Sequence, residues 1–453
     1  MDLAISEIAK AVGGAVCGDF DNGKIKIKNI ITDSRAVLPD SLFFAIKGEN
    51  ADGHDFVVQA IRQGAFCAVV QKNFAGDALV IAVEDTLKAL LDTAKYYKSL
   101  HKNLAVTAGV TGSVGKTATK EFMYSVFAEK FKTQKSKGNK NTEIGLPMTV
   151  FALEEETEAL VLEMGMSGFG EISRLSKTAN PDIGVITNIG TAHISKLGSR
   201  EGIKRAKFEI LDGMGKNSIL ILNADDPMLF AEKNKTGKKE YLFGINNKEA
   251  DLKAEDTEVD YEKRQSVFTV KNFRYKIPAA GTHNIYNALP AIAAGRIYGL
   301  SDEEIQAGLN NFQNAEMRQN IYGFKGITII DDCYNASLES VKAAFETLSK
   351  INKNKKIAVL SDILETGEFA DEIHKKIGEM AIESKIDRIF VCGGKSKLIF
   401  DFINDNKKCV YFEDKSQIAG PLFGEAKKGD AVLFKASRGM ALETVIGDFK
   451  GLF

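Results

Sequence analysis

The sequence has few cysteines, and none of them are paired. Its 453 residues include five, at positions 17, 67, 333, 392 and 409, and no two have the C-x-x-C spacing. A disulfide framework or a cysteine-bound zinc cluster is therefore not expected. This pattern is typical of a protein from a reducing, cytoplasmic compartment.

The sequence also lacks an excess of either charge and any long apolar run. Lysine and arginine total 60 against 61 acidic residues, so neither nucleic acid nor an anionic membrane is expected as a partner. No segment approaches the roughly 20 apolar residues of a membrane-spanning helix. The first residues, MDLAISEIAK, carry acids and do not read as a secretory signal. We expect a cytoplasmic enzyme or binding protein without membrane insertion.

Short apolar segments alternate with amphipathic ones almost throughout, which is typical of α/β architecture. The length exceeds what one core usually holds, so two or three domains are expected. We divide the chain into residues 1–100, 101–314 and 315–453, with the charged stretch YYKSLHKN at 96–103 as the first link. The first domain is expected to be the smallest and to contain both helices and strands.

The second domain is expected to be built on a parallel sheet. The runs LAVTAG, ALVLEM, IGVITN and SILILN are continuously apolar, as in strands covered on both faces. Residues 232–278 are more polar and predict antiparallel surface strands. The third domain repeats the strand–helix alternation from GITIIDD to AVLFKASRG. Because ligands gather at the carboxyl ends of parallel strands, a site is expected in the cleft between these two domains.

A glycine-rich loop, GVTGSVGKTATKEF at residues 109–122, joins a predicted strand to a predicted helix. The strict P-loop pattern requires glycine five positions before Gly115, where Val110 stands instead. The alternatives are a variant nucleotide site and a flexible turn with a surface lysine. The order of strand, glycines, Lys116-Thr117 and helix favours the first, with backbone N–H groups directed at phosphate oxygens. Thr117 could then face Mg²⁺.

Lys207 stands on the apolar side of a predicted helix. At 100° per residue the stretch SREGIKRAKFEILDG, 199–213, forms one stripe that includes Lys207 among Ile203, Ala206, Ile210 and Leu211. A buried ammonium is costly unless it is paired, and a snorkelling lysine is an equally good interpretation. Glu163 and His193 follow strands of the same sheet and are candidate partners, since both side chains can bind a divalent metal. Either residue alone is better explained by solvent exposure or a structural hydrogen bond.

Taken together, these segments resemble the Mur ligase family, whose members make the peptide of bacterial cell-wall precursors with ATP. The family pattern TGxxGKT is matched by TGSVGKT at 111–117, which accounts for the displaced glycine. The resemblance implies a central P-loop-type ATPase domain with a parallel sheet, a Rossmann-like C-terminal domain and a smaller α/β N-terminal domain. The ATP-binding residues it implies are Thr111, Gly112, Ser113, Val114, Gly115, Lys116, Thr117, Asn284, Arg318 and Asp332.

The resemblance also implies Mg²⁺ and a carbamylated lysine, formed from CO₂, as cofactors. The implied metal-binding residues are Thr117, Glu163, His193 and Lys207 as its carbamate. A carbamate would turn the misplaced cation into an anion facing the metal. The residues expected to act in catalysis are Lys116, Glu163, His193, Lys207 and Arg318.

Within the family, IDDCYNAS at 330–337 is similar to the motif of the members that add D-alanyl-D-alanine. Members that add the third residue have D-Y-A-H-T-P there, and folylpolyglutamate synthases have D-G-A-H-N-P. The implied reaction joins D-alanyl-D-alanine to UDP-N-acetylmuramoyl-tripeptide through an acyl phosphate, in peptidoglycan precursor synthesis. Both substrates are small molecules, and the protein is expected to be a monomer in the bacterial cytoplasm.

Further segments resemble the family's substrate-binding stretches, namely TDSR at 32–35, LFFAIKGENADGHDF at 42–56, GNKNTEIGLP at 138–147 and KASRGMALE at 435–443. The implied substrate-binding residues are Ser34, Arg35, Asn139, Asn141, Thr142, Asn335, Ser437 and Arg438. The third domain departs from the pattern at Ser361 and Thr366, where glycine and leucine are usual, and NASLES lacks a proline. The remaining alternatives are a ligase for the third amino acid or for folate glutamates, a non-catalytic nucleotide-binding regulator, and a structural module.

Overall fold

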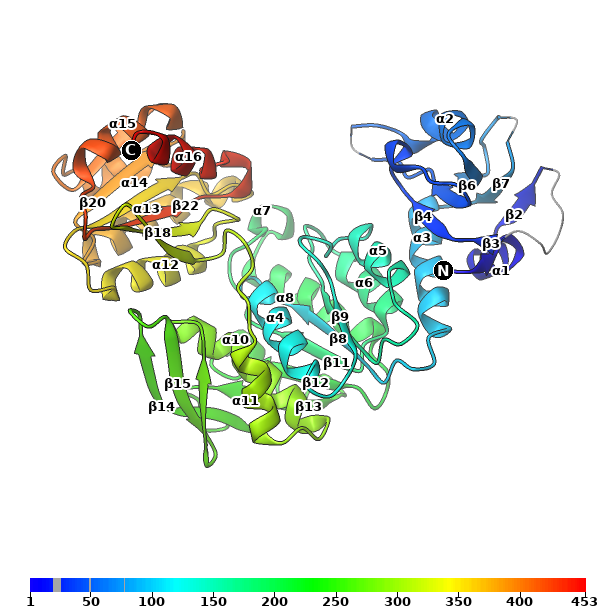
Figure 1. The fold of residues 1–453 in the computed structure, drawn as a ribbon, viewed down its shortest axis with the longest axis horizontal. Helices are drawn as coiled ribbons and strands as arrows, with labels where there is room; N and C mark the ends of the chain where they lie inside the picture. Colours follow the sequence, from blue (N-terminus) through cyan, green and yellow to red (C-terminus); the bar gives the residue numbers. More distant parts are fainter. Residues whose placement is uncertain (19–25, 49, 77) are drawn as a thin grey trace.

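The computed structural model describes residues 1–18, 26–48, 50–76 and 78–453, which form an N-terminal, a central and a C-terminal lobe (Figure 1). All three lobes combine helices with largely parallel sheets, so the predicted α/β class is confirmed. The alternating stretch IKIKNI at 25–30 predicts a strand, and its residue 25 lies outside the described residues, as does residue 49 of the segment 42–56. Within the described ranges, no helix has the length and apolar character needed to cross a membrane.

The N-terminal lobe holds a five-stranded sheet of order β2-β7-β6-β5-β4, in which only β2 is antiparallel to its neighbour. The strands of this sheet are β2 (Ala15–Cys17), β4 (Asn29–Ile31), β5 (Ser41–Phe44), β6 (Ala65–Gln71) and β7 (Val80–Val83). Two short strands, β1 (Leu3–Ala4) and β3 (Lys26–Ile27), pair with each other in a separate antiparallel sheet. The α-helices of the lobe are α1 (Ile5–Val12), α2 (Val57–Arg62) and α3 (Thr86–Ser99), with 3₁₀ turns η1 (Ser34–Ala36) and η2 (Gly53–Phe56). The first half of the link predicted at 96–103 is helical, because α3 continues to Ser99 and buries Tyr97; its role as a link stays a prediction.

The central lobe is built on a nine-stranded sheet of order β16-β15-β14-β13-β12-β11-β8-β10-β9. Its strands are β8 (Val106–Thr111), β9 (Thr133–Lys135), β10 (Ala159–Glu163), β11 (Ile183–Ile186), β12 (Ile219–Asn223), β13 (Lys239–Gly244), β14 (Leu252–Asp260), β15 (Gln265–Val270) and β16 (Phe273–Ile277). Strands β8 to β14 pair with one another in parallel, and β14, β15 and β16 pair antiparallel. This confirms the parallel core and the antiparallel strands predicted within 232–278.

Helices cover this sheet on both sides (Figure 1). They are α4 (Lys116–Phe127), α5 (Gly145–Phe151), α6 (Glu171–Ala179), α7 (Ile194–Leu197), α8 (Arg200–Phe208), α9 (Pro227–Phe230), α10 (Thr282–Ile297) and α11 (Asp302–Asn310). The helix predicted over 199–213 is α-helical only to Phe208 and continues as the 3₁₀ turn η3 (Glu209–Gly213). Its predicted apolar stripe is nevertheless turned inward, since Ile203, Ala206 and Ile210 are buried.

The C-terminal lobe has a six-stranded sheet of order β17-β18-β22-β19-β20-β21, in which only the edge strand β17 is antiparallel. Its strands are β17 (Asn320–Phe324), β18 (Ile327–Asp332), β19 (Lys356–Ser361), β20 (Arg388–Cys392), β21 (Cys409–Phe412) and β22 (Ala431–Lys435). Its helices are α12 (Leu338–Lys350), α13 (Ala370–Glu383), α14 (Lys397–Ile403), α15 (Ala419–Glu425) and α16 (Glu443–Gly451), with 3₁₀ turns η4 (Gly367–Phe369), η5 (Lys415–Gln417) and η6 (Arg438–Met440). The predicted domain boundaries stay a prediction.

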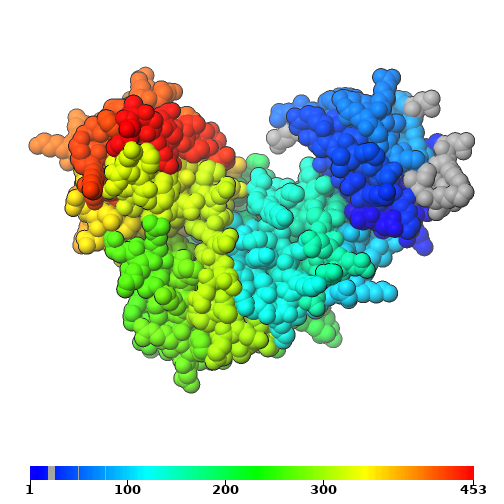
Figure 2. Space-filling view, in the orientation of Figure 1, coloured from blue at the N-terminus to red at the C-terminus, as the bar shows by residue number. Residues whose placement is uncertain are grey.

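The N- and C-terminal lobes flank a wide hollow above the central lobe, and they do not meet across it in this view (Figure 2). The C-terminal lobe contacts the central lobe through residues of α7 and η4, among others. The central and C-terminal sheets are thus the ones close enough to share a site.

An aromatic side chain of helix α4 packs on the segment that follows α11. Phe122 is fully buried and stacks on Phe312, with 3.7 Å between ring centroids and 12° between planes. Contact between the two rings adds to the stabilisation that burial of their apolar area provides. This packing fixes the first turn of α4, which carries the glycine-rich loop.

Replacing Phe122 with alanine is expected to lower the free energy of unfolding by about 3–5 kcal/mol, because it removes the stacked ring and leaves a cavity. A urea titration followed by circular dichroism measures this change. The control is Phe402→Ala, since Phe402 is 40% exposed and its removal is expected to change stability by about 1 kcal/mol or less. Equal losses in the two variants would contradict the packing argument.

Candidate active site

The carboxyl ends of the parallel strands bring the predicted polar residues to one edge of the central sheet. Strand β8 ends at Thr111, β10 at Glu163 and β12 at Asn223. Across the cleft, β18 of the C-terminal lobe ends at Asp332 and β22 at Lys435. Two sheets therefore direct their strand ends at one cleft, as the sequence predicts.

The glycine-rich loop has a backbone that only glycine adopts without strain. Gly112 has a φ of +149° and Gly115 a φ of +83°. A Cβ atom on Gly112 would lie 1.8 Å from Thr187 Oγ1, and one on Gly115 would lie 2.3 Å from Asn287 Oδ1. Both φ values and both contacts exclude larger side chains. These contacts define the conformation of the loop, and its role as a phosphate cradle stays a prediction.

Residues that follow β11 hold this loop from beneath. The Thr187 hydroxyl donates a hydrogen bond of 2.6 Å to the carbonyl of Val114, and Asn188 Nδ2 donates one of 3.0 Å to the same carbonyl. The Val114 N–H in turn donates to Asn188 Oδ1 at 3.0 Å. Sequence reasoning did not single out these two side chains, although their position at the end of the apolar run IGVITN was a signal.

Lys116 is the first residue of helix α4, and its side chain folds back over the loop. Its ammonium group donates to the carbonyls of Gly112, at 2.8 Å, and Ser113, at 3.2 Å. Burial lowers the pKa of Lys116 to about 8, while the Glu163 carboxylate raises it and the Arg318 guanidinium lowers it. An anion at this place would favour the charged lysine.

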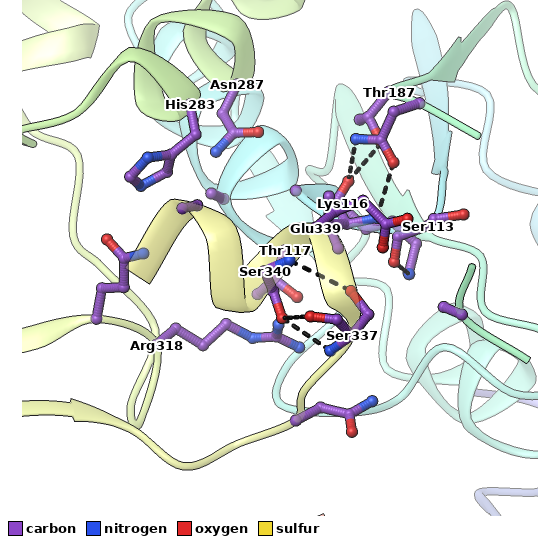
Figure 3. A pocket seen from close by; sticks show the side chains of 18 of the residues that line it. Ser113, Lys116, Thr117, Thr187, His283, Asn287, Arg318, Ser337, Glu339 and Ser340 are labelled. Carbon is purple, nitrogen blue, oxygen red and sulfur yellow. Dashed lines mark hydrogen bonds between the residues drawn. The ribbon is translucent and has the colours of Figure 1, made fainter. Parts of the chain in front are cut away.

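Arg318 lies on the opposite wall of the cleft, in the segment between the central and C-terminal lobes. Its guanidinium stacks 3.9 Å from the centroid of the Tyr334 ring. Figure 3 shows Arg318, the first turn of α12 and the glycine-rich loop around one pocket. The arginine therefore enters the same space as Lys116, as predicted.

Glu163 is almost fully buried, at 2% exposure, directly beneath the start of α4. Its two oxygens accept hydrogen bonds of 2.9 Å from Thr117 Oγ1 and from Asn141 Nδ2. The Lys120 ammonium lies 3.9 Å away. Lys120 itself was not predicted, because an ordinary surface lysine fits the sequence TATKEF equally well. This cluster presents hydroxyl and carboxylate oxygens, the donors that Mg²⁺ prefers.

Lys207 is 2% exposed, so the structure excludes the snorkelling interpretation. Within the described part of the chain, no carboxylate lies within 4.0 Å of its ammonium. Burial first, and then the nearby charge of Lys116, lower the pKa of Lys207 well below its ordinary value. This shift favours the uncharged amine, which is the form that reacts with CO₂.

A cavity of about 280 Å³ lies between the central and C-terminal lobes. The predicted residues that line it are Ser113, Val114, Gly115, Lys116, Thr117, His193, Asn284, Arg318, Asp332 and Asn335. Asn284 donates through Nδ2 to the carbonyl of Ala280 at 2.9 Å. The structure thus gathers most of the implied nucleotide-binding residues around one space.

The far wall of this cavity contains a buried ion pair that sequence reasoning missed. Lys435 Nζ lies 2.8 Å from Asp332 Oδ2 and donates a 2.8 Å hydrogen bond to the carbonyl of Asn335. Burial raises the pKa of Asp332, whereas Lys435 and Arg318 oppose that shift. In the sequence, Lys435 ends the apolar run AVLFK. A lysine at that position is equally well explained by exposure to solvent.

A second cavity, of about 360 Å³, adjoins the first, since His193 and Asn335 line both. Ser437 and Arg438 also line it, and Ser437 Oγ accepts a 2.9 Å hydrogen bond from the N–H of Leu364. Glu365 lines it as well, with its Oε2 atom 2.5 Å from His193 Nδ1. Glu365 is a further residue that sequence reasoning did not identify.

The remaining predicted substrate residues are not brought to these cavities. Ser34 and Arg35 lie in the N-terminal lobe, where Arg35 forms an exposed ion pair of 2.7 Å with Asp33. The Asn139 carbonyl accepts from the N–H of Asn141, and Thr142 Oγ1 accepts from the N–H of Gly145. These contacts are local, and of this group only Asn141 reaches Glu163.

Glu163 and His193 do not form a ready metal site by themselves. In the ranges that the structure describes, no three His, Cys, Asp or Glu side chains are grouped so as to hold a metal ion. The hydroxyl of Thr117 and a modified Lys207 would have to supply the missing ligands, together with oxygens of a bound molecule.

Comparison with known proteins matches three successive parts of the chain to models of Mur ligases. They are the Mur ligase family catalytic domain at residues 26–107, the middle domain at 110–295 and the glutamate ligase domain at 317–438. The chain is 39% identical to the UDP-N-acetylmuramoyl-tripeptide–D-alanyl-D-alanine ligase of Bacillus subtilis, over 98% of this chain and 97% of that protein. It is 30% identical to the ligase of the same name from Escherichia coli, over 95% of both chains.

Solved structures agree with this similarity. A crystal structure of MurF from Acinetobacter baumannii superimposes with a TM-score of 0.92 at 29% identity, covering 100% of this chain and 99% of that one. The structure of MurF from Thermotoga maritima in complex with ADP gives a TM-score of 0.84 at 30% identity, with 93% and 97% coverage.

The pKa of Lys116 predicts how the binding of a phosphate anion depends on pH. In the ligand-free protein this pKa is about 8, below the ordinary 10.5, and a bound anion raises it again. Binding should therefore take up as much as about 0.5 proton at pH 8, and affinity should fall as the pH rises from 8 to 10. Calorimetric titration with ADP, without divalent cation, in buffers of different ionisation enthalpy measures the uptake. The control is Lys116→Met, and equal proton uptake by both proteins would contradict the assignment.

Proposed function

The chain belongs to the Mur ligase family, and from this premise we infer that it is the ligase that joins D-alanyl-D-alanine to UDP-N-acetylmuramoyl-tripeptide. The reaction consumes ATP and produces the UDP-N-acetylmuramoyl-pentapeptide precursor of peptidoglycan. The observation that carries this conclusion is the 39% identity to a ligase of that name over 98% of the chain. The cleft supports it, because the cradle, the buried cations and the second cavity suit a reaction with ATP and two further substrates.

The chemistry requires activation of the tripeptide carboxylate. An oxygen of this carboxylate attacks the γ-phosphorus of ATP, which forms an acyl phosphate and releases ADP. The amine of D-alanyl-D-alanine then attacks the carbonyl carbon, the amide bond forms, and phosphate leaves while the amine loses its proton. These steps need orientation and charge stabilisation more than a protein nucleophile.

The residues around the first cavity suit ATP. We propose that the loop from Thr111 to Thr117 surrounds the phosphates and that Lys116 leaves the loop carbonyls to neutralise them. Arg318 is assigned to the transferring phosphoryl group, and Asn284 to the adenine. Asp332, held by Lys435, is assigned to the nucleotide on the wall contributed by the C-terminal lobe.

The oxygen donors beneath α4 fit Mg²⁺. Thr117 and Glu163 would hold one ion, since a hydroxyl, a carboxylate and substrate phosphates are its usual ligands. His193 and the carbamate of Lys207 would hold a second. Bound Mg²⁺ supplies positive charge that offsets the phosphate oxygens during transfer.

The second cavity is assigned to D-alanyl-D-alanine. Asn335, Ser437 and Arg438 line it, and the guanidinium of Arg438 suits a peptide carboxylate. Ser34 and Arg35 of the N-terminal lobe are assigned to the UDP end of the other substrate. Asn139, Asn141 and Thr142 are assigned to the stretch between that end and the reacting carboxylate.

The three-domain division at residues 100/101 and 314/315 fits this assignment. The central and C-terminal domains enclose the phosphates, and water kept out of the cleft cannot hydrolyse the acyl phosphate. We further propose that the protein acts as a monomer in the bacterial cytoplasm, on small-molecule substrates and without nucleic acid.

Mass spectrometry of the products tests the function directly. The purified protein with ATP, D-alanyl-D-alanine and UDP-N-acetylmuramoyl-tripeptide is expected to form the pentapeptide precursor with equimolar phosphate. The tripeptides ending in diaminopimelate and in lysine are supplied separately.

Parallel reactions supply the substrates of the third-residue ligases and of folylpolyglutamate synthases. An amide product in either of these would contradict the assignment of the acceptor. Nucleotide binding without phosphate release in every reaction would indicate a regulator instead.

Lys207→Ala is expected to reduce ligation nearly to background, because the anion that faces the metal is lost, and added short carboxylic acids should restore part of the rate. A second measurement does not need turnover. Wild-type protein equilibrated with ¹³C-bicarbonate should show a carbamate resonance by NMR that is absent from the variant. Wild-type-like turnover of Lys207→Ala, or the same ¹³C spectrum for both proteins, would refute the carbamate.

A further inference from the structure

The segment that follows β11, residues 190–197, is contacted by two parts of the C-terminal lobe. Thr191 Oγ1 donates a hydrogen bond of 3.2 Å to Glu339 Oε2 at the start of α12. Gly367 of η4 approaches so closely that a Cβ atom on it would lie 2.7 Å from Ser195 Cβ. This segment is therefore a main point where the C-terminal lobe rests on the central one.

His193 and Glu365 meet at the centre of this contact, with 2.5 Å between Nδ1 and Oε2. His193 has a φ of +63° and Glu365 a φ of +59°, a region that residues other than glycine rarely adopt. Both residues adopt this conformation at the place where the two lobes meet, so the contact brings two constrained backbone positions together.

The positions of the two side chains relative to the cavities differ. His193 lines both cavities, whereas Glu365 lines only the second. Glu365 is thus outside the nucleotide cavity but touches a residue that borders it.

Among the described residues, His193 Nδ1 is buried without a hydrogen bond of regular geometry, and the Glu365 carboxylate lies 2.5 Å from it. We propose that Glu365 is a positioning residue for His193: its carboxylate turns to accept the Nδ1–H of the imidazole, which leaves the Nε2 lone pair for the site where the two cavities meet. The pair exists only while the C-terminal lobe rests on the central lobe. This inference rests on the proposed function, because it assigns Glu365 a part in that reaction.

The chemistry of imidazole supports this role. A neutral histidine carries one ring proton, and the hydrogen bond at one nitrogen decides which nitrogen stays free. A carboxylate at Nδ1 is the arrangement that orients metal-binding histidines in other proteins.

The arrangement couples assembly of the site to domain position. The two residues come from different lobes, so opening of the cleft separates them. His193 then loses its fixed tautomer, and the site is complete only when the C-terminal lobe has brought the second cavity into place. Activation of the tripeptide carboxylate is thereby tied to the presence of the lobe that lines the acceptor cavity.

Glu262 provides a matched control for a contact that only holds the two lobes together. It lies at the turn between β14 and β15, accepts a hydrogen bond of 3.2 Å from the N–H of Asn352, and lies 3.4 Å from Lys353 Nζ. Its side chain is 51% exposed, against 53% for Glu365. It lines neither of the two cavities.

The kinetic test compares Glu365→Ala, Glu365→Gln and Glu262→Ala. Glu365→Ala is expected to lower kcat about 10–100-fold, the usual effect of removing such a partner. The KM for ATP and the affinity for ADP should stay unchanged, because Glu365 does not line the nucleotide cavity. Glu365→Gln should retain an intermediate kcat, since its amide oxygen can still accept the Nδ1–H. Glu262→Ala should keep the wild-type kcat.

The second measurement is ¹⁵N NMR of the histidine ring nitrogens in the ADP-bound full-length protein, with His193→Gln to assign the signal. Wild-type protein should show His193 as the Nδ1–H tautomer, and Glu365→Ala should lose that preference. This readout needs no turnover, so it decides the inference even if the pentapeptide is not formed and the proposed function fails. An unchanged tautomer in Glu365→Ala, or a kcat loss no larger than that of Glu262→Ala, would overturn the proposal.

Discussion

The gathering of Lys116, Lys207 and Arg318 at one cleft is the constraint on which the rest of this structure depends. Lys116 and Lys207 are close enough for the charge of one to lower the pKa of the other, and burial lowers both further. Arg318 adds to the effect on Lys116. Burying cations without partners is costly, so the folded protein is arranged to receive anions. The phosphates of a nucleotide, and a carbamate on Lys207, would each remove part of that cost.

The surrounding scaffold holds these charges in place because most of their neighbours cannot move. Gly112 and Gly115 press against Thr187 and Asn287 so closely that no side chain fits. By contrast, the contacts between the central and C-terminal lobes include individual polar ones, such as Thr191 with Glu339. A rigid cradle beside a polar, separable interface suits a reaction in which one substrate is activated before another attacks.

Sequence reasoning identified the local parts of this design well. The apolar runs that became β8, β10, β11 and β12 were identified because burial on both faces leaves a continuous pattern. The loop at 111–117 was recognised because its function depends on neighbours in sequence. The end of α3 and the 3₁₀ turn after Phe208 were not predicted, since packing against other helices and turns decides where a helix stops. The resemblance to Mur ligases added the distant residues that no local pattern connects.

The sequence by itself determined the class of fold, the cradle and the Lys207 anomaly, because each follows from periodicity or from adjacent residues. Only the tertiary structure decided whether Lys207 is buried or reaches solvent, because periodicity names a face of a helix but not what covers it. It alone paired Lys435 with Asp332 and Glu365 with His193. Asp332 and Lys435 are distant in sequence but lie opposite each other on the paired strands β18 and β22. Glu365 and His193 come from different lobes and meet only where the C-terminal lobe contacts the central one.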